Sequence, residues 1–120
     1  MKQVIIIVRP GKYFATKDAL AANRFFALSS KEVLGRGRAR VFYKNGDGID
    51  VPGPDTRYER AFVAKRMIKI FVEDARVDEL IGVVELVNQT GNHGDGKVFV
   101  LPVESALRIH TGETGDDALS

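Results

Sequence analysis

The sequence predicts an α+β fold in which four antiparallel strands are backed by two helices. Two copies of the order strand–helix–strand follow each other along the chain, and each is about as long as one β-α-β unit. A long aperiodic segment, residues 37–64, separates them. The length of 120 residues is that of a single domain, residues 1–120, without a linker or a second domain. Together these observations indicate the ferredoxin-like split β-α-β sandwich.

The first half of the chain predicts a strand, a helix and a second strand. Gln3–Val8 is rich in β-branched residues, as buried strands are, and Pro10-Gly11 makes a turn. Apolar residues then recur at helical spacing from about Phe14 to Arg24. The apolar face of that helix would hold Ala15, Ala19, Ala22 and Phe26. The second strand is expected near Ala27–Leu34, and Gly35-Arg36-Gly37 ends it.

The second half repeats this order. Arg66–Val72 alternates between polar and apolar residues, as a half-buried strand does. Asp74 is expected to cap the following helix and Gly91 to end it. The apolar face of this helix would hold Val77, Leu80, Ile81, Val84 and Val87. Val98–Val103 is the fourth strand, and Ala106–Ile109 is a candidate for a short fifth one.

Two regions fall outside this pattern. Residues 37–64 contain Asn-Gly and Pro-Gly-Pro turn formers, and Arg40–Tyr43 and Ile49–Val51 are placed to pair as a short ribbon around the Asn-Gly turn. Loops of this length inside a small domain are uncommon and are usually functional or mobile. The chain then closes with a polar tail, about residues 104–120.

Composition restricts the class of protein. The chain is 44% hydrophobic and 28% charged, which is the balance of a soluble globular domain. It contains no cysteine, which favours an intracellular, cytoplasmic protein. The apolar run Val4–Val8 is far too short to span a bilayer, so no membrane insertion is expected. One face of the predicted sheet has no helix to cover it, which indicates an oligomer.

The net charge of +2 is distributed unevenly. Residues 36–66 hold eight basic and four acidic residues, so the basic surplus lies in this one segment. Arg36 and Arg38 flank Gly37, and arginines beside glycine backbone suit phosphate or carboxylate groups. The alternatives are a loop made soluble by charge and a nucleic-acid-binding surface that uses the basic residues with neighbouring aromatics. Those aromatics are Phe42, Tyr43 and Tyr58.

The segment Thr90–Lys97 is the strongest candidate for a ligand site. It has three glycines in six residues, so its N–H groups can point into one concavity, with a lysine at its mouth. Such a cradle suits a polyphosphate, and the alternative is a glycine-rich turn with a solvated lysine. A Walker-type NTPase is excluded, because Val98 replaces the required Ser or Thr and a helix here runs into a strand.

No catalytic constellation is evident, so the chain is predicted not to be an enzyme. His93 and His110 are the only histidines, and His93-x-Asp95 alone is weak evidence for a metal site. No Ser/His/Asp trio and no cysteine nucleophile are present, and no metal ligands are assigned.

Several motifs resemble those of the PII nitrogen-regulatory signal-transduction proteins. The C-terminal motifs are Thr90-Gly91-x-x-Gly94-Asp95-Gly96-Lys97-Val98-Phe99-Val100 and Arg108-Ile109-x-Thr111-Gly112-Glu113. The N-terminal ones are Met1-Lys2, Arg9-Pro10-x-Lys12, Ala19-Leu20 and Glu32-Val33-Leu34-Gly35-Arg36-Gly37-Arg38. The resemblance implies a homotrimer with three nucleotide clefts between subunits, in which ATP and ADP compete. It also implies a protruding T-loop, about residues 37–64, that changes shape and contacts partner proteins.

The resemblance assigns nucleotide-binding roles residue by residue. The phosphate-binding B-loop would be Gly94, Asp95, Gly96 and Lys97, and the base of the T-loop would be Gly35, Arg36, Gly37 and Arg38. Ser29 would contact the adenine where the family has a threonine. Arg108 and His110 would arrive from the neighbouring subunit, and His110 replaces an arginine, which gives a weaker and pH-dependent phosphate contact.

Other positions concern effectors and targets. Lys65 matches a lysine that pairs with 2-oxoglutarate, but Ala39 replaces the glutamine whose oxygen ligates magnesium, so magnesium would need water or another ligand. The long loop and Arg36 resemble the nitrogenase-associated subgroup, which regulates nitrogenase directly. Tyr43 and Tyr58 lie in this loop, and the resemblance does not assign either of them to the tyrosine that some relatives uridylylate. The alternatives are a regulator of an ammonium channel or assimilation enzyme, a nucleic-acid-binding module, and an enzyme that hydrolyses the nucleotide.

Overall fold

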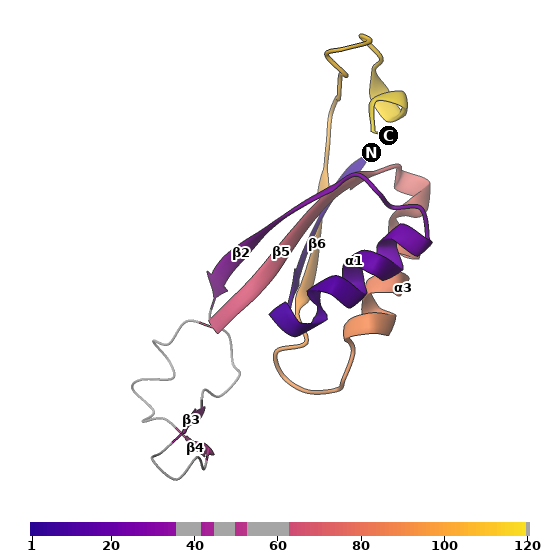
Figure 1. Cartoon of the computed structure of the whole chain (residues 1–120). Helices are drawn as coiled ribbons and strands as arrows, with labels where there is room; N and C mark the ends of the chain where they lie inside the picture. Colours follow the sequence, from indigo (N-terminus) through magenta and orange to yellow (C-terminus); the bar gives the residue numbers. More distant parts are fainter. Residues whose placement is uncertain (36–41, 45–49, 53–62, 120) are drawn as a thin grey trace.

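The structure is a computed structural model that describes residues 1–35, 42–44, 50–52 and 63–119. Its strands and helices follow one another in the predicted order (Figure 1). The strands are β1 (Lys2–Val8), β2 (Leu28–Gly35), β3 (Phe42–Lys44), β4 (Asp50–Pro52), β5 (Val63–Val72) and β6 (Lys97–Pro102). The helices are α1 (Tyr13–Ala22) and α3 (Val77–Asn88), with 3-10 turns η1 (Pro10–Lys12), η2 (Asp74–Arg76) and η3 (Gly115–Ala118).

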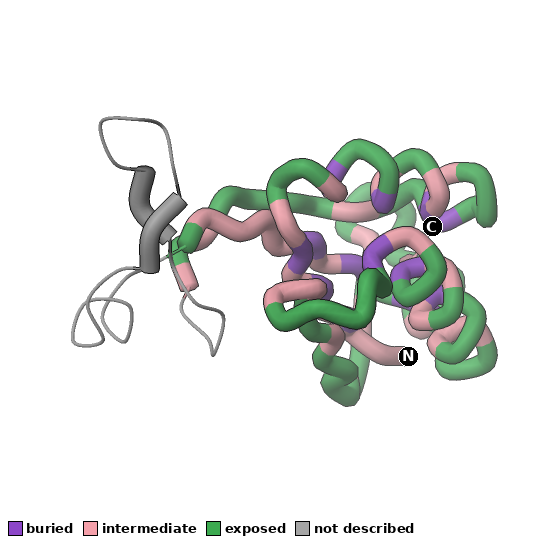
Figure 2. Tube along the Cα trace, turned by 90° about the horizontal axis from the view of Figure 1, so that it is seen from below, coloured by how far each residue is buried: buried purple, intermediate pink, exposed green. Residues whose placement is uncertain are grey.

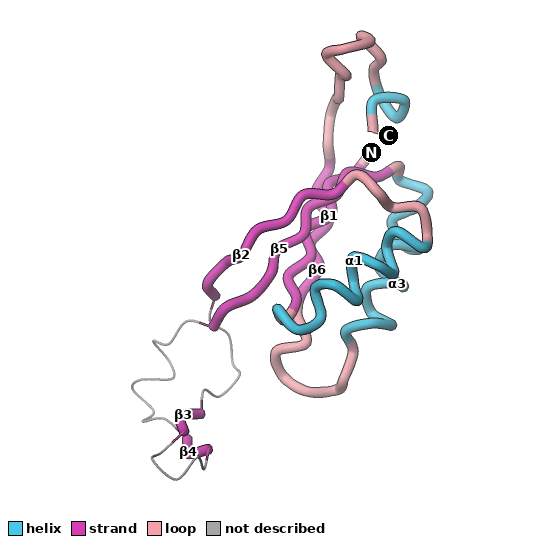
Figure 3. Tube along the Cα trace, in the orientation of Figure 1, coloured by secondary structure: helices cyan, strands magenta, loops and turns pink. Residues whose placement is uncertain are grey.

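Four strands form one antiparallel sheet in the order β2-β5-β1-β6. In register, Val8 lies opposite Arg66, Val33 opposite Lys65, and Ile7 opposite Lys97. Both helices cover the same face of this sheet (Figures 1 and 3). The predicted ferredoxin-like α+β architecture is therefore confirmed.

The core lies between the helices and the sheet (Figure 2). Because successive strand residues point to opposite faces, every second residue of β1 and of the second half of β5 is buried. The buried apolar residues are Val4, Ile6, Val8, Tyr13, Leu20, Phe25, Ile68, Ile70, Val72, Leu80 and Val84. Burial of their apolar surface is the main term that holds the domain together.

The predicted apolar face of α1 is wrong. Ala15 and Phe26 are exposed, and the helix instead buries Tyr13, Thr16 and Leu20. Thr16 hides this stripe from a hydropathy pattern because it is polar, yet its hydroxyl donates to the Lys12 carbonyl at 2.7 Å. The same hydroxyl accepts a 3.0 Å bond from the amide of buried Asn88, which joins the two helices.

The predicted boundaries of α3 are also partly wrong. Asp74 does not cap the helix. It lies in the preceding 3-10 turn, where its carboxylate pairs with the N-terminal amine at 2.8 Å and lies 4.0 Å from Lys2. The helix ends at Asn88, before Gly91. Of the predicted apolar face, Leu80 and Val84 are buried and the other three residues are partly buried.

The loop ribbon is confirmed with shifted bounds, because Phe42–Lys44 pairs antiparallel with Asp50–Pro52. The fifth strand is wrong, because residues 106–109 make only an isolated bridge from Leu107 to Thr114. The predicted polar tail contains the short turn η3, in agreement with its polar, turn-forming sequence.

The second face of the sheet carries large apolar side chains that no helix or strand of the described residues covers. Phe71, Phe99 and Leu101 are 45%, 47% and 38% exposed. Ile5 and Ile7 on the same face are half-buried. An apolar surface of this kind marks an interface with another molecule.

Candidate functional site

The glycine-rich segment links the end of α3 to the start of β6 and bends as the sequence predicts. Gly91, Gly94 and Gly96 have φ angles of +83°, +92° and +126°. An alanine Cβ at position 96 would stand 2.1 Å from the Ile7 carbonyl oxygen. Gly96 is therefore required both by its backbone conformation and by the close approach of β1.

The carboxylate of Asp95 holds this segment together from inside. It accepts hydrogen bonds from the backbone N–H groups of Thr90 at 2.8 Å and Gly91 at 3.1 Å, and from the Thr90 hydroxyl. It also accepts from the Arg9 guanidinium at 2.7 Å. The Thr90 hydroxyl and amide, followed by Arg9, hold the pKa of Asp95 well below its ordinary range, so the side chain is ionised at neutral pH.

Two basic side chains from the sheet hold the carbonyls of the same segment. Arg9, directly after β1, donates to the His93 carbonyl at 3.0 Å. Lys65, on β5, donates to the Gly94 carbonyl at 2.9 Å. Burial and then repulsion from Arg9 lower the pKa of Lys65, while Asp95 acts in the opposite direction.

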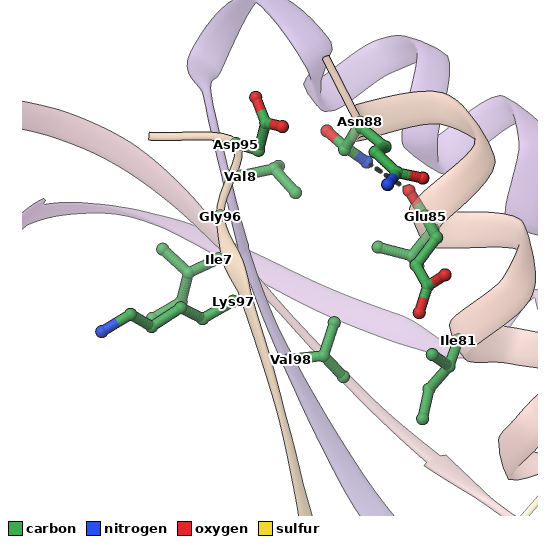
Figure 4. A pocket seen from close by; sticks show the side chains of 11 residues that line it. Ile7, Val8, Ile81, Glu85, Asn88, Asp95, Gly96, Lys97 and Val98 are labelled. Carbon is green, nitrogen blue, oxygen red and sulfur yellow. Dashed lines mark hydrogen bonds between the residues drawn. The ribbon is translucent and has the colours of Figure 1, made fainter. Parts of the chain in front are cut away.

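Lys97 begins β6 and is exposed. Its side chain extends away from α3, whereas Val98 points toward Ile81 (Figure 4). Beside them, a groove of about 530 Å³ runs between α3 and β6, with Asp95, Gly96 and Lys97 in its lining. The amine of Lys97 is therefore available at the end of the glycine-rich segment.

Only part of the predicted site comes together within one chain. Gly35 ends β2, two residues after Val33, which pairs with Lys65 of β5. It lies at the same end of the sheet as residues 94–97. Ser29 lies farther along β2, opposite Lys69. The C-terminal tail, which contains Arg108, lies at the opposite end of the sheet from the glycine-rich segment (Figure 1). Arg108 donates to Glu113 at 3.4 Å and to the Asp117 carbonyl at 3.3 Å.

The remaining predicted positions are distributed as follows. His110 is exposed in the same tail as Arg108. Arg36, Gly37, Arg38, Ala39 and Tyr58 lie outside the described residues, and Tyr43 belongs to β3. Sequence reasoning missed the roles of Arg9 and Thr90, although both stand in the motifs that carry the family resemblance.

Residues 1–113 match the family model described as nitrogen regulatory protein P-II. The chain belongs to the P-II family. A GlnB-like protein 2 of the nitrogen fixation nifHD region from Methanothermobacter marburgensis is 40% identical over 99% of this chain and 100% of the relative. The corresponding Methanothermococcus thermolithotrophicus protein is 38% identical over 99% of this chain and 98% of its own length.

A solved structure of Arabidopsis thaliana PII bound to citrate has the same fold as this P-II chain. The two share 29% identity with a TM-score of 0.73, and the match covers 98% of this chain and 88% of the other. The nifHD-region relatives agree with the predicted nitrogenase-associated subgroup. The protein is thus a signal-transduction regulator of nitrogen metabolism, and the members of its family are regulatory proteins that form trimers. Among the described residues, no helix is long and apolar enough to cross a membrane.

Proposed function

We propose that this P-II protein binds ATP and ADP in clefts between the subunits of a homotrimer. The observation that carries the proposal is the tethered glycine segment with an exposed lysine at its end. Arg9 and Lys65 both donate to this segment, Lys97 follows it at the start of β6, and the Asp95 carboxylate is already paired with Arg9. Within the described part of the chain, Lys97 pairs with no carboxylate. The surplus positive charge suits a polyphosphate.

A shared site explains why the predicted residues are separated within one chain. Ser29 lies farther along β2, opposite Lys69, and the tail that contains Arg108 and His110 lies at the opposite end of the sheet from the glycine segment of the same subunit (Figure 1). A neighbouring subunit supplies them in the proposed trimer, Ser29 to the adenine and the two tail residues to the phosphates. The uncovered apolar face of the sheet gives the reason to associate, since burying it removes Phe71 and Phe99 from water.

The proposed signal leaves the site through the T-loop. At the base of the T-loop, Gly35 and Val63 are directly paired across β2 and β5. Arg36 and Arg38 are proposed to contact phosphate at this base. A nucleotide shifts the T-loop only if it binds two loop conformations with different affinities, so ATP and ADP are proposed to favour different conformations.

An effector site is proposed at the same end of the sheet. Lys65 has three amine donors, and the Gly94 carbonyl takes one, so a 2-oxoglutarate carboxylate can bind another. Ala39 supplies no oxygen for magnesium, so 2-oxoglutarate is proposed to bind weakly. The proposed target is nitrogenase, in the cytoplasm. An ammonium channel or an assimilation enzyme is the alternative that a pull-down from nitrogen-limited cells, with and without nucleotide, would distinguish.

Calorimetry with ATP and ADP tests the nucleotide site. Lys97→Ala removes one charge-assisted hydrogen bond and should weaken ATP binding by about 1–3 kcal/mol. Lys17→Ala is the matched control, because it removes the same charge from α1, where Lys17 lies over the Phe14 ring. Unchanged ATP affinity in Lys97→Ala would show that the glycine segment is not the phosphate site. Steep, salt-dependent binding of RNA or DNA would favour a nucleic-acid-binding module instead.

A further inference from the structure

Asp95 lies between Gly94 and Gly96 in the glycine segment, yet its side chain is engaged by the protein. One oxygen receives the Arg9 guanidinium and the Thr90 hydroxyl, and the other receives the N–H groups of Thr90 and Gly91. The side chain is 24% exposed and that of Arg9 is 32% exposed. Both oxygens are therefore engaged by the chain itself.

A carboxylate in this position is poorly suited to touch a phosphate. An ionised carboxylate can only accept hydrogen bonds, and a phosphate at neutral pH has almost no O–H group left to donate one. Its negative charge also repels a polyphosphate. We propose that Asp95 is a positioning residue: it closes residues 90–95 into a fixed turn and does not contact the nucleotide. This inference rests on the proposed nucleotide site and deepens it.

The turn is held at both ends and in the middle. Asp95 joins its last residue to its first two, Thr90 and Gly91. Arg9 and Lys65 then fix the His93 and Gly94 carbonyls to the sheet. Because these donors hold the two carbonyls, the neighbouring peptide groups keep one orientation before a ligand binds. A preorganised loop loses less conformational freedom on binding, which raises affinity without a new contact.

Arg9 has a double role in this arrangement. Its guanidinium donates to the Asp95 carboxylate and to the His93 carbonyl, so one side chain connects β1 to two points of the turn. The register places the end of β1 beside β5, because Val8 pairs with Arg66, next to Lys65. The two cations that hold the turn therefore lie at the same end of two adjacent strands, Arg9 directly after β1 and Lys65 on β5.

Asp95→Asn separates positioning from contact by the sign of its effect. If Asp95 faces the phosphates, removal of a negative charge should strengthen ATP binding. If Asp95 positions the turn, ATP binding should weaken by about tenfold or more. Asparagine has one acceptor oxygen, and its NH2 group cannot accept the hydrogen bonds that the second carboxylate oxygen accepts from the N–H groups of Thr90 and Gly91. Calorimetry on the full chain measures the ATP affinity of the wild type and of Asp95→Asn. The amide NMR shifts of Gly94 and Gly96 show whether the conformation of the turn has changed.

Thr90→Val provides a second variant that leaves the charge unchanged. It removes the hydroxyl donor to Asp95, and Thr90→Ser restores it. We expect Thr90→Val to weaken ATP binding and shift the Gly94 and Gly96 amides before ATP is added, and Thr90→Ser to resemble the wild type. Lys97→Ala is the contrast: it should weaken ATP binding with little change in those amides.

The outcomes are distinct from those of the proposed function. Wild-type protein that binds no ATP overturns the nucleotide site, and the amide shifts of the ligand-free variants still show whether Asp95 fixes the turn. Wild-type protein that binds ATP, together with Asp95→Asn that binds it as tightly or more tightly, overturns the positioning role. Unmoved amides in both Asp95→Asn and Thr90→Val also overturn it.

Discussion

Gly96→Ala is a strong perturbation of the entry into β6. The new Cβ would lie 2.1 Å from the Ile7 carbonyl oxygen and 3.4 Å from the Val8 Cα, both in the backbone of β1. Because β1 lies inside the sheet between β5 and β6, that oxygen has little room to retreat. The loop must move, and position 96 must leave its φ of +126°. We expect a cost of about 2–4 kcal/mol, from backbone strain and from weakened pairing of Lys97 with Ile7.

Urea denaturation at one fixed protein concentration measures this cost. Gly82→Ala is the matched control, because Gly82 lies within α3 and an added Cβ there meets nothing within 4 Å. That control should gain about 0.5–1 kcal/mol from helix propensity. A Gly96→Ala protein within about 0.5 kcal/mol of wild type would refute the close approach to β1 as a constraint.

Two further predictions concern charge and effector binding. The pKa of Asp95 is lower in the folded than in the unfolded protein, so its stabilising contribution is present above its unfolded pKa of about 4 and is lost as the pH falls through the folded value. Urea denaturation between pH 5 and pH 2 should therefore show a smaller loss of stability in Asp95→Asn than in wild type, and equal losses would contradict this. Ala39→Gln should strengthen 2-oxoglutarate binding in a titration with Mg-ATP, because the new oxygen can ligate the metal, and wild type that binds as tightly would show that the oxygen is unnecessary.

The architecture could be predicted from the sequence because each strand and helix has its own local signal. Val4–Val8 is β-branched, and the α3 pattern places Leu80 and Val84 on one face, which the structure confirms. The α1 face could not be predicted in the same way. Thr16 is a polar residue, yet it is buried because its hydroxyl is hydrogen-bonded to Lys12 and Asn88. Asn88 is 72 residues away in the sequence, so a local pattern does not contain this information.

The site shows the same division between local and distant information. The bends at Gly91, Gly94 and Gly96 follow from residue type. The function of Asp95 depends on Arg9, 86 residues earlier, which reaches it only because β1 and β6 are neighbours in the sheet. Asp74 is a similar case: the local pattern predicts a helix cap, but its carboxylate pairs with the N-terminal amine, which is distant in the sequence.

The most direct test of the nucleotide-sensor function is an NMR titration of the isotope-labelled wild-type protein with ATP. The binding site predicts saturable shifts at Gly94, Gly96 and Lys97, together with shifts at Ser29 and Arg108, which a second subunit would bring to the same cleft. Absence of saturable shifts up to millimolar ATP, or shifts confined to residues away from these positions, would contradict it.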